Sequence, residues 1–367
     1  MNGTIYMPVG EVCSSISDTY RKKKNMVTLI NTSDVLEGRV LNHERVPNSN
    51  LKGQFKKTFQ RDDILYSEIR PQNRRFAYVD FSPIDYIAST KLMVIRAKKD
   101  VVSPKYLYYF LKNSSTVAEL QLLAETRSGT FPQITFSEVA NLTIPVPSLA
   151  VQEVIVQTMQ CLEDKITCNE QINDNLQQQA QAIYSSMFID NPDPAWSHGH
   201  LSDLITVKYG KDHKKLADGI YPVYGSGGIM RYVERPLYNK ESVLIPRKGT
   251  LNNVMYVNQP FWSVDTMFYT EMKLPNVAKF VYHFVKAKDL ASMNAGSAVP
   301  SMTTDILNAM EVVIPSASAL EEFESLVAPM YEAMEANNVQ SKALSQMRDT
   351  LLPKLMSGEI DVSDIQL

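Results

Sequence analysis

Two copies of one helical pattern, a constant 168 residues apart, constrain this chain more than any other feature. In each copy apolar positions alternate in steps of four and three residues, from Ile155 to Met187 and from Phe323 to Leu355. This spacing is the seam of a coiled coil, so each copy predicts a long helix that packs against a partner. The natural partner is the other copy. The paired positions are Ile155, Met159, Leu162, Ile166, Asn169, Asn173, Leu176, Ala180, Ile183 and Met187 with Phe323, Val327, Met330, Met334, Asn337, Ser341, Leu344, Arg348, Leu351 and Leu355.

The duplication extends beyond the two helices. The same offset relates Ile134 to Met302. With small shifts, the segment Lys105–Lys112 also matches Lys279–Lys286, as expected when loops drift in length while helices and strands stay in register. The chain is therefore predicted to be two globular units, each followed by a long helix. The expected segments are a first globular domain at 1–148, a long helix at 149–189, a second globular domain at 190–316 and a second long helix at 317–367.

Polar residues interrupt both seams near their middles. Asn169 and Asn173 lie in the first seam, and Asn337 and Ser341 in the second. Antiparallel pairing brings these four side chains together, and a polar layer in an apolar seam fixes register at some cost in stability. Parallel pairing would also match them but would put both globular units at one end. We expect antiparallel helices that close a pseudo-twofold tandem repeat into a ring.

The composition is that of a soluble cytoplasmic protein. With 44% hydrophobic and 21% charged residues the chain can bury two ordinary cores, and its apolar runs are shorter than a membrane span. The first residues lack the basic and apolar regions of a signal peptide. Three cysteines without a CxxC pair fit a reducing compartment.

The small net charge of −3 conceals an uneven distribution. Residues 1–148 carry +6 and residues 190–316 carry +1, whereas the helical segments 149–189 and 317–367 carry −4 and −6. A polyanion would therefore bind the globular units and be repelled by the helices, which are expected to act as scaffold or docking surface. Charge alone favours DNA binding only weakly in the second unit.

The globular units are predicted to be rich in β-structure. Short runs of aromatic and β-branched residues, such as Ile64–Tyr66 and Ser242–Ile245, are bounded by Pro, Gly, Asn or Asp. One or two helices per unit are expected between the strands, the clearest at Tyr106–Lys112 and Phe280–Lys286. The fold class is therefore α+β, with two β-rich domains separated by two long antiparallel coiled-coil helices.

Basic clusters fall in the loops between predicted strands. Arg and Lys can grip phosphates or guanine, and Asn and Gln can bond adenine in the major groove, so their combination suits DNA. Solvated loop charges are the simpler alternative, but the clusters recur at matching places in both units: Arg70–Arg75 is matched to Lys248–Asn253, and Arg21–Lys24 to Lys211–Lys215. The candidates in the first unit are Arg21, Lys22, Lys23, Arg70, Asn73, Arg74 and Arg75, and those in the second are Lys211, Lys214, Lys215, Lys248, Asn252 and Asn253.

Several short motifs do not form a catalytic site. Asp265, Glu271 and Lys273 have the spacing of a metal-dependent nuclease, but the first unit has no equivalent. Gly225–Gly228 precedes no helical pattern and predicts a tight turn rather than a nucleotide loop. His198-Gly-His200 lacks further ligands at zinc spacing. We expect no catalytic centre and no metal.

The whole arrangement resembles the specificity (S) subunits of type I restriction-modification systems. Thr350–Ile360 closely follows the C-terminal signature of that family, and Gln152–Glu153 with Leu162–Ile166 is similar to its central conserved region. Three segments look like a widespread target-recognition pattern: Tyr221–Ile229, Arg247–Thr250 and Trp262–Thr266. The first unit departs from that pattern, with Ser89–Thr90 where the second has Asp265–Thr266. This divergence leaves open which bases each unit reads.

The resemblance implies a non-catalytic DNA reader. Each globular unit would recognise one half of a bipartite double-stranded target, with Arg247 and Thr250 added to the candidate DNA-binding residues. The helices would dock two methyltransferase (M) subunits that carry S-adenosylmethionine, and a restriction (R) subunit would join them. No cofactor is expected on this chain. The alternatives are a nuclease that uses Asp265, Glu271 and Lys273, and a coiled-coil scaffold that binds no DNA.

Overall fold

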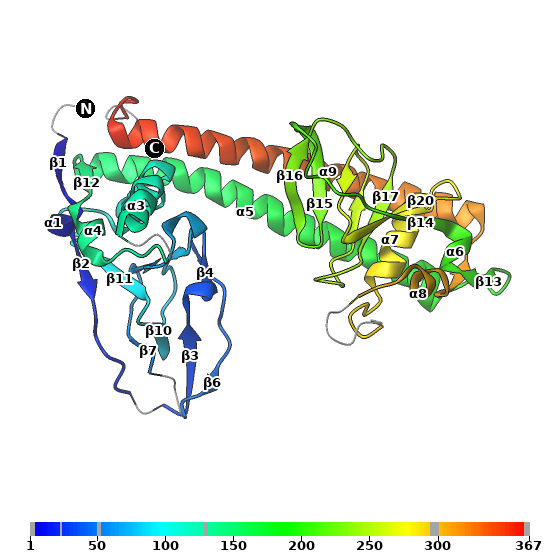
Figure 1. Ribbon diagram of the computed structural model, residues 1–367, viewed down its shortest axis with the longest axis horizontal. Coiled ribbons are helices and arrows are strands. Elements are labelled where there is room, and N and C mark those ends of the chain that lie inside the picture. Colours follow the sequence, from blue (N-terminus) through cyan, green and yellow to red (C-terminus); the bar gives the residue numbers. More distant parts are fainter. Residues whose placement is uncertain (1–3, 23, 50–52, 128–130, 294–300, 363–367) are drawn as a thin grey trace. The chain divides into compact units, whose positions relative to one another are not determined.

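Two compact units make up the computed structural model, which describes residues 4–22, 24–49, 53–127, 131–293 and 301–362 (Figure 1). The first unit comprises residues 1–169 and 339–367, and the second comprises residues 170–338. Each unit therefore contains one β-rich domain and a stretch of both long helices. Of the candidate residues, Lys23 lies outside the described residues.

The β-rich domain of the first unit is built on a four-stranded antiparallel sheet in the order β2-β11-β8-β9. A second sheet has the order β6-β3-β10-β7, in which β3 and β10 are parallel. β1 pairs with β12, and β4 with β5. The strands are β1 (Ile5–Pro8), β2 (Cys13–Ile16), β3 (Met26–Ile30), β4 (Val35–Leu36), β5 (Arg39–Val40), β6 (Val46–Pro47), β7 (Phe55–Lys57), β8 (Ile64–Ser67), β9 (Phe76–Tyr78), β10 (Tyr86–Ser89), β11 (Leu92–Ala97) and β12 (Thr143–Val146). The helices are α1 (Val9–Val12), α2 (Pro104–Lys112), α3 (Ser114–Arg127) and α4 (Phe136–Asn141), with 3-10 turns η1 (Thr32–Asp34) and η2 (Pro71–Asn73).

The second unit repeats this plan. Its four-stranded sheet has the order β14-β20-β17-β18, and each strand corresponds to the one in the same place of β2-β11-β8-β9. A three-stranded sheet β16-β15-β19 and the pair β13-β21 complete it. The strands are β13 (Ser197–His200), β14 (Ile205–Tyr209), β15 (Asp218–Gly225), β16 (Gly228–Val233), β17 (Ser242–Pro246), β18 (Met255–Val257), β19 (Trp262–Ser263), β20 (Met267–Met272) and β21 (Glu311–Ile314). The helices are α6 (Leu201–Leu204), α7 (Ala278–Lys286) and α8 (Thr304–Asn308). The predicted tandem repeat of α+β domains is confirmed.

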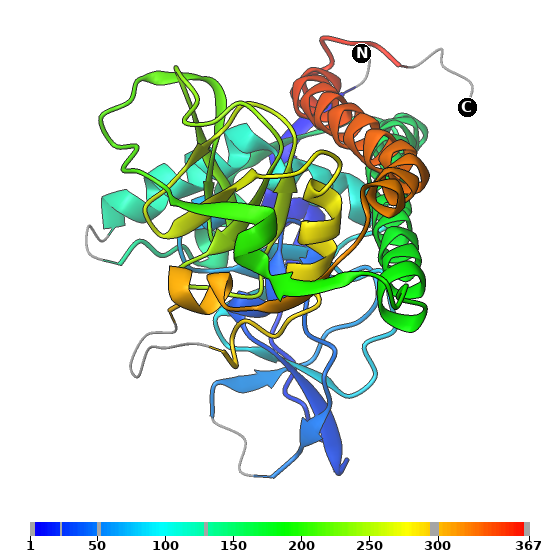
Figure 2. The ribbon, with the colours of Figure 1, turned by 90° about the vertical axis from the view of Figure 1, so that its right-hand side faces the viewer.

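The long helices α5 (Leu149–Ser185) and α9 (Ala317–Ser357) begin directly after the last strand of each domain. A π-helical turn at Ser186–Asp190 extends α5. In each unit the segment of α5 lies beside a segment of α9 that runs the opposite way (Figure 2). All twenty predicted seam positions are buried or half-buried. The predicted antiparallel coiled coil is therefore confirmed.

The polar residues of the seam set its register. In the first unit the Asn169 side-chain amide donates to Ser341 Oγ over 3.1 Å and to Gln340 Oε1 over 2.9 Å. In the second unit the Asn337 amide donates to Asn173 Oδ1 over 2.8 Å. Residue numbers rise along α5 as they fall along α9, so the polar residues pair in the expected antiparallel direction.

Each domain shares one hydrophobic core with its helices. In the first unit Tyr106 and Ile95 pack in the same cluster as Ile155 of α5 and Leu355 of α9. In the second unit the equivalent cluster joins Phe280 and Ile245 to Ala180 and Phe323. Each domain is therefore packed into one core with its segments of the long helices and is not a separate body attached to them. None of the helices among the described residues is long and apolar enough to cross a membrane.

Candidate DNA-binding loops

Three segments that resemble a target-recognition pattern meet at one end of the second domain. β15 and β19 are parallel neighbours, and the Val264 amide donates to the Tyr224 carbonyl over 3.1 Å. The Arg247 amide donates to the Thr266 carbonyl over 2.9 Å. Residues far apart in the sequence thus form a single cluster of loops.

Two glycines shape this cluster. The predicted tight turn at Gly225–Gly228 is confirmed as the two-residue connection of the hairpin β15-β16, with Gly228 at φ +112°. Gly249 has φ +85°, and a Cβ there would lie 2.7 Å from Ser226 Oγ. Because this backbone conformation strains other residues, glycine lets the loop after β17 lie directly against the hairpin turn.

The candidate amides of this loop are used within the protein. Asn253 donates to the Ser226 carbonyl over 2.8 Å. Asn252 donates to Asp289 Oδ1 over 3.0 Å and accepts from the Ala291 amide over 2.9 Å. Both side chains therefore hold the loop in shape through these bonds.

The cations of the cluster point outward or stack on an aromatic ring. Lys248, Lys211 and the side chain of Thr250 are exposed. Lys211 is fixed through its backbone, because its amide donates to the Ser263 carbonyl and its carbonyl accepts from Trp262 Nε1, both over 2.8 Å. Lys214 and Lys215 lie in the same exposed loop.

Arg247 and Tyr209 form a pair that the sequence pattern did not single out. The guanidinium lies 5.4 Å from the centre of the Tyr209 ring, and Arg247 Nη1 donates to the Asp265 carbonyl over 3.2 Å. Tyr209 is 52% exposed although it is aromatic. Its position directly before Gly210-Lys211, at the end of a strand, was the available signal.

The first domain holds its loops with the same backbone bonds. The Glu68 amide donates to the Lys91 carbonyl over 3.0 Å, and the Glu68 carbonyl accepts from Ile134 over 2.9 Å. In the second domain Arg247 makes the same two bonds, to the Thr266 carbonyl and from the Met302 amide. One loop framework is therefore used twice.

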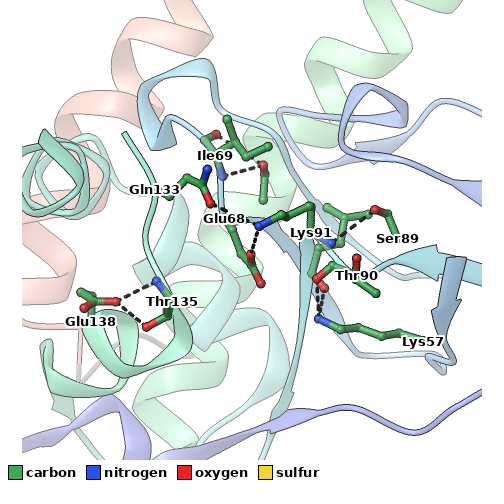
Figure 3. A network of polar contacts seen from close by, with 11 residues as sticks. Lys57, Glu68, Ile69, Ser89, Thr90, Lys91, Gln133, Thr135 and Glu138 are labelled. Carbon is green, nitrogen blue, oxygen red and sulfur yellow. Dashed lines mark hydrogen bonds and ion pairs between the residues drawn. The ribbon is translucent and has the colours of Figure 1, made fainter. Parts of the chain in front are cut away.

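Side-chain contacts tighten this framework in the first domain (Figure 3). Lys91 Nζ lies 3.5 Å from Glu68 Oε2 and 3.2 Å from Gln133 Oε1. Lys57 Nζ donates to the carbonyls of Thr90 and Leu92 over 3.0 and 2.8 Å, and burial lowers the pKa of Lys57. These lysine contacts hold the neighbouring loops together.

The matching backbone bonds of Glu68 and Arg247 show that the predicted pairing of the basic loops is off by one residue. Arg70 was matched to Lys248 in the sequence, but the structure places Ile69 opposite Lys248, because Ile69 bridges Gln133 as Lys248 bridges Ser301. Between equivalent residue pairs of the strands, the loop that joins β8 to β9 is one residue longer than the loop that joins β17 to β18, and it contains the 3-10 turn η2. The turn is flanked by Arg70 and Arg74, whose φ values of 44° and 51° are left-handed. The loops correspond, but their cations do not.

The arginines of the first loop differ in what they contact. Arg75 donates to the Ser33 carbonyl over 3.0 Å, which ties it to the fold. Arg74 donates to Ser114 Oγ over 2.9 Å. Arg70 is exposed, 5.8 Å from the centre of the Phe131 ring, and Asn73 is exposed as well. Arg70 and Asn73 are the candidates best placed to meet a ligand.

A second basic surface of the first domain lies where β3 begins. Lys22 and Lys24 line a shallow hollow of about 370 Å³ together with Asn48. Asn48 fixes its rim by donating to the Lys24 carbonyl over 2.9 Å. Arg21 is exposed beside it. The sequence singled out the lysines but gave no sign of Asn48, which directly follows β6.

The structure does not bring together the three residues of the nuclease alternative, Asp265, Glu271 and Lys273. Asp265 precedes β20 and Glu271 lies near its other end, roughly 15–20 Å away at the rise of a strand. Glu271 pairs with Lys208 at 3.7 Å, and Lys273 donates to the Ser202 carbonyl over 2.6 Å. Among the described residues, no group of three or more His, Cys, Asp or Glu side chains could hold a metal ion.

Comparison with known proteins supports the family that the sequence motifs resemble. The family model of the type I restriction modification DNA specificity domain matches residues 6–178 and 195–324. The HindI specificity subunit of Haemophilus influenzae is 27% identical, over 91% of this chain and 94% of its own length. The MjaIX specificity subunit of Methanocaldococcus jannaschii is 25% identical, over 77% of each chain.

Solved structures share the fold. The S subunit of a type I restriction-modification system from M. genitalium matches with a TM-score of 0.56 at 18% identity, over 98% of this chain and 97% of that one. A chain from a study of complex assembly in the type I system matches with a TM-score of 0.51 at 14% identity, over 98% and 99%. Because the family model matches both domains, the chain belongs to the family of type I restriction-modification DNA specificity subunits.

Proposed function

We propose that each β-rich domain reads one half of a bipartite double-stranded DNA target. The observation that carries this is the shared loop framework with different side chains at equivalent places: Arg247 and Lys248 in one domain, Glu68 and Ile69 in the other. A shared loop backbone that carries different side chains suits two domains that recognise different base sequences. The exposed candidates Arg70, Lys211 and Lys248 would meet DNA, whereas Arg75, Asn252 and Asn253 would shape the loops.

The long helices would dock the catalytic partners. Both are acidic, and exposed apolar side chains lie along them, among them Ile172, Val339 and Met347 at 40, 61 and 51% exposure. Such a surface suits protein rather than DNA. We propose that two methyltransferase subunits carrying S-adenosylmethionine bind there, that a restriction subunit joins them, and that this chain supplies recognition without catalysis in the cytoplasm.

Loop variants in the assembled methyltransferase complex test the assignment of half-sites. Lys248→Ala should slow methylation and relax discrimination in one half of the target only, and Arg70→Ala should do so in the other half. Each lost base contact costs about 1–3 kcal/mol, or roughly 5- to 150-fold. Methylation rates on duplexes substituted in either half would measure the effect.

Lys240→Ala is the matched control. Lys240 is an exposed lysine before β17, at the opposite end of the strand from Lys248, so its loss changes the charge equally. It should leave both halves unchanged. If Lys248→Ala and Arg70→Ala instead slowed methylation of every duplex equally, the loops would be phosphate contacts and their assignment as readers would be wrong.

A further inference from the structure

Helices α2 and α7 occupy the same place in the two repeats and face the long helices. Lys105 and Lys279 lie in their first turns, and Tyr109 and His283 follow four residues later. Residues four apart share one face of a helix. Each short helix thus presents two polar side chains, one turn apart, toward the coiled coil.

In the first unit both side chains bond to α5. Lys105 Nζ donates to Gln160 Oε1, and its ammonium lies 5.7 Å from the centre of the Tyr78 ring. Tyr109 donates its hydroxyl to Glu163 Oε2 over 2.9 Å. Burial, and next the Glu163 carboxylate, raise the pKa of Tyr109, so this hydroxyl keeps its proton.

In the second unit the corresponding side chains bond to α9. Lys279 Nζ lies 2.5 Å from Glu324 Oε1, and its ammonium is 5.2 Å from the centre of the Tyr256 ring. The Tyr331 hydroxyl and His283 Nε2 are 2.9 Å apart. Tyr78 and Tyr256 occupy equivalent strands, β9 and β18.

The two units place these pairs in similar but not identical positions, and their chemistry differs. Glu163 corresponds to Tyr331 at the 168-residue offset, so the Tyr109–Glu163 pair corresponds to the His283–Tyr331 pair. Gln160 and Glu324, the partners of the two lysines, instead lie one helical turn apart in the repeat. In both units the lysine reaches the long helix that follows its own domain. We call these four pairs the domain clamp: Lys105–Gln160, Tyr109–Glu163, Lys279–Glu324 and His283–Tyr331.

We propose that the domain clamp fixes the angle of each recognition domain on its long helices, and so decides which spacer length between half-sites is accepted. This rests on the proposed function. Apolar contacts between domain and helices are non-directional and tolerate sliding. Hydrogen bonds and ion pairs are directional, so they hold one orientation. The clamp residues position the readers without touching DNA.

The burial of the clamp supports a holding role. The Lys279 side chain is only 6% exposed, and a second carboxylate, Glu241, lies 3.3 Å from its ammonium. Removing the lysine alone would leave a partly buried carboxylate unpaired, whereas replacing both partners by apolar residues is often tolerated. The test therefore changes both partners together.

The variant is Lys279→Met with Glu324→Met, assembled with the methyltransferase subunits. We expect the bases read in each half to stay the same, while methylation of targets with one base pair more or less in the spacer rises at least about tenfold relative to the cognate spacer. Tenfold corresponds to about 1.4 kcal/mol of lost discrimination. Lys286→Met, at the exposed end of α7, is the control and should keep the wild-type spacer preference.

A second variant, Lys105→Met with Gln160→Met, repeats the test in the first unit. If both double variants assemble and methylate every spacer more slowly but in the wild-type ratio, the clamp only stabilises the fold and the proposal is wrong. If the double variants do not assemble, Lys279→Arg and Glu324→Gln replace them, and an unchanged spacer preference in both again overturns the proposal. A wild-type complex that recognises no bipartite target would instead refute the proposed function on which this inference rests.

Discussion

Replacing Gln152 with leucine is expected to lower the free energy of unfolding of the first unit by roughly 3–9 kcal/mol. Gln152 is fully buried at the start of α5. Its Oε1 accepts from the Ser103 amide over 2.8 Å, and its Nε2 donates to the carbonyls of Val101 and Pro147 over 3.1 and 2.9 Å. Leucine would leave three backbone groups without this partner, and each costs about 1–3 kcal/mol.

Chemical denaturation of the variant measures this loss. Gln157→Leu is the control, because Gln157 is exposed on the same helix and bonds only to Glu153 in the described contacts. Gln157→Leu should change the free energy of unfolding by no more than about 0.5 kcal/mol. A loss of less than about 1 kcal/mol for Gln152→Leu would mean that the amide does not join α5 to the segment before α2.

Acidification is expected to destabilise the second unit through His283. This side chain is fully buried among Gln181, Tyr331 and the rings of Tyr184 and Phe323, and burial lowers its pKa from 6.5 to about 4. Above pH 6.5 the His283 imidazole is neutral in both the folded and the unfolded chain, so its full contribution to stability is present. As pH falls from 6.5 toward 4, the unfolded chain binds a proton that the folded chain excludes. Stability should fall by roughly 3 kcal/mol in all, about 1.4 kcal/mol per pH unit.

His283→Gln isolates this effect from the carboxylates that also titrate. Glutamine can accept from the Tyr331 hydroxyl but does not titrate. The difference in unfolding free energy between wild type and variant should therefore change by roughly 2 kcal/mol between pH 6.5 and 5. A difference that is constant over this range would show that His283 is not held neutral by burial.

The architecture was predictable because its signals are periodic. The seam steps predicted both long helices, Asn169, Asn173, Asn337 and Ser341 marked where the two seams meet, and the head-to-tail duplication favoured the antiparallel direction. Strand positions also followed from short apolar runs. α3 was not singled out, because its apolar residues do not gather on one face and the sequence Ser114–Arg127 lacks a helical stripe.

The candidate site was only partly predictable. Composition identified the basic loops, but whether a polar side chain faces solvent or bonds within the protein depends on neighbours from distant segments. Asn253 bonds to Ser226, and Arg75 to Ser33, contacts that no local pattern encodes. The one-residue difference between the two basic loops was equally hidden, because a 3-10 turn absorbs it.

We propose that this chain reads two separate half-sites for a partner that methylates DNA. Methylated adenines can be mapped by long-read sequencing in cells that produce this chain with a type I methyltransferase subunit. We predict a single asymmetric motif of two specified halves around an unspecified spacer of fixed length, and no methylation by the chain alone. Methylation of one continuous motif, or methylation without the partner subunit, would show that this chain does not read two half-sites for a separate methyltransferase.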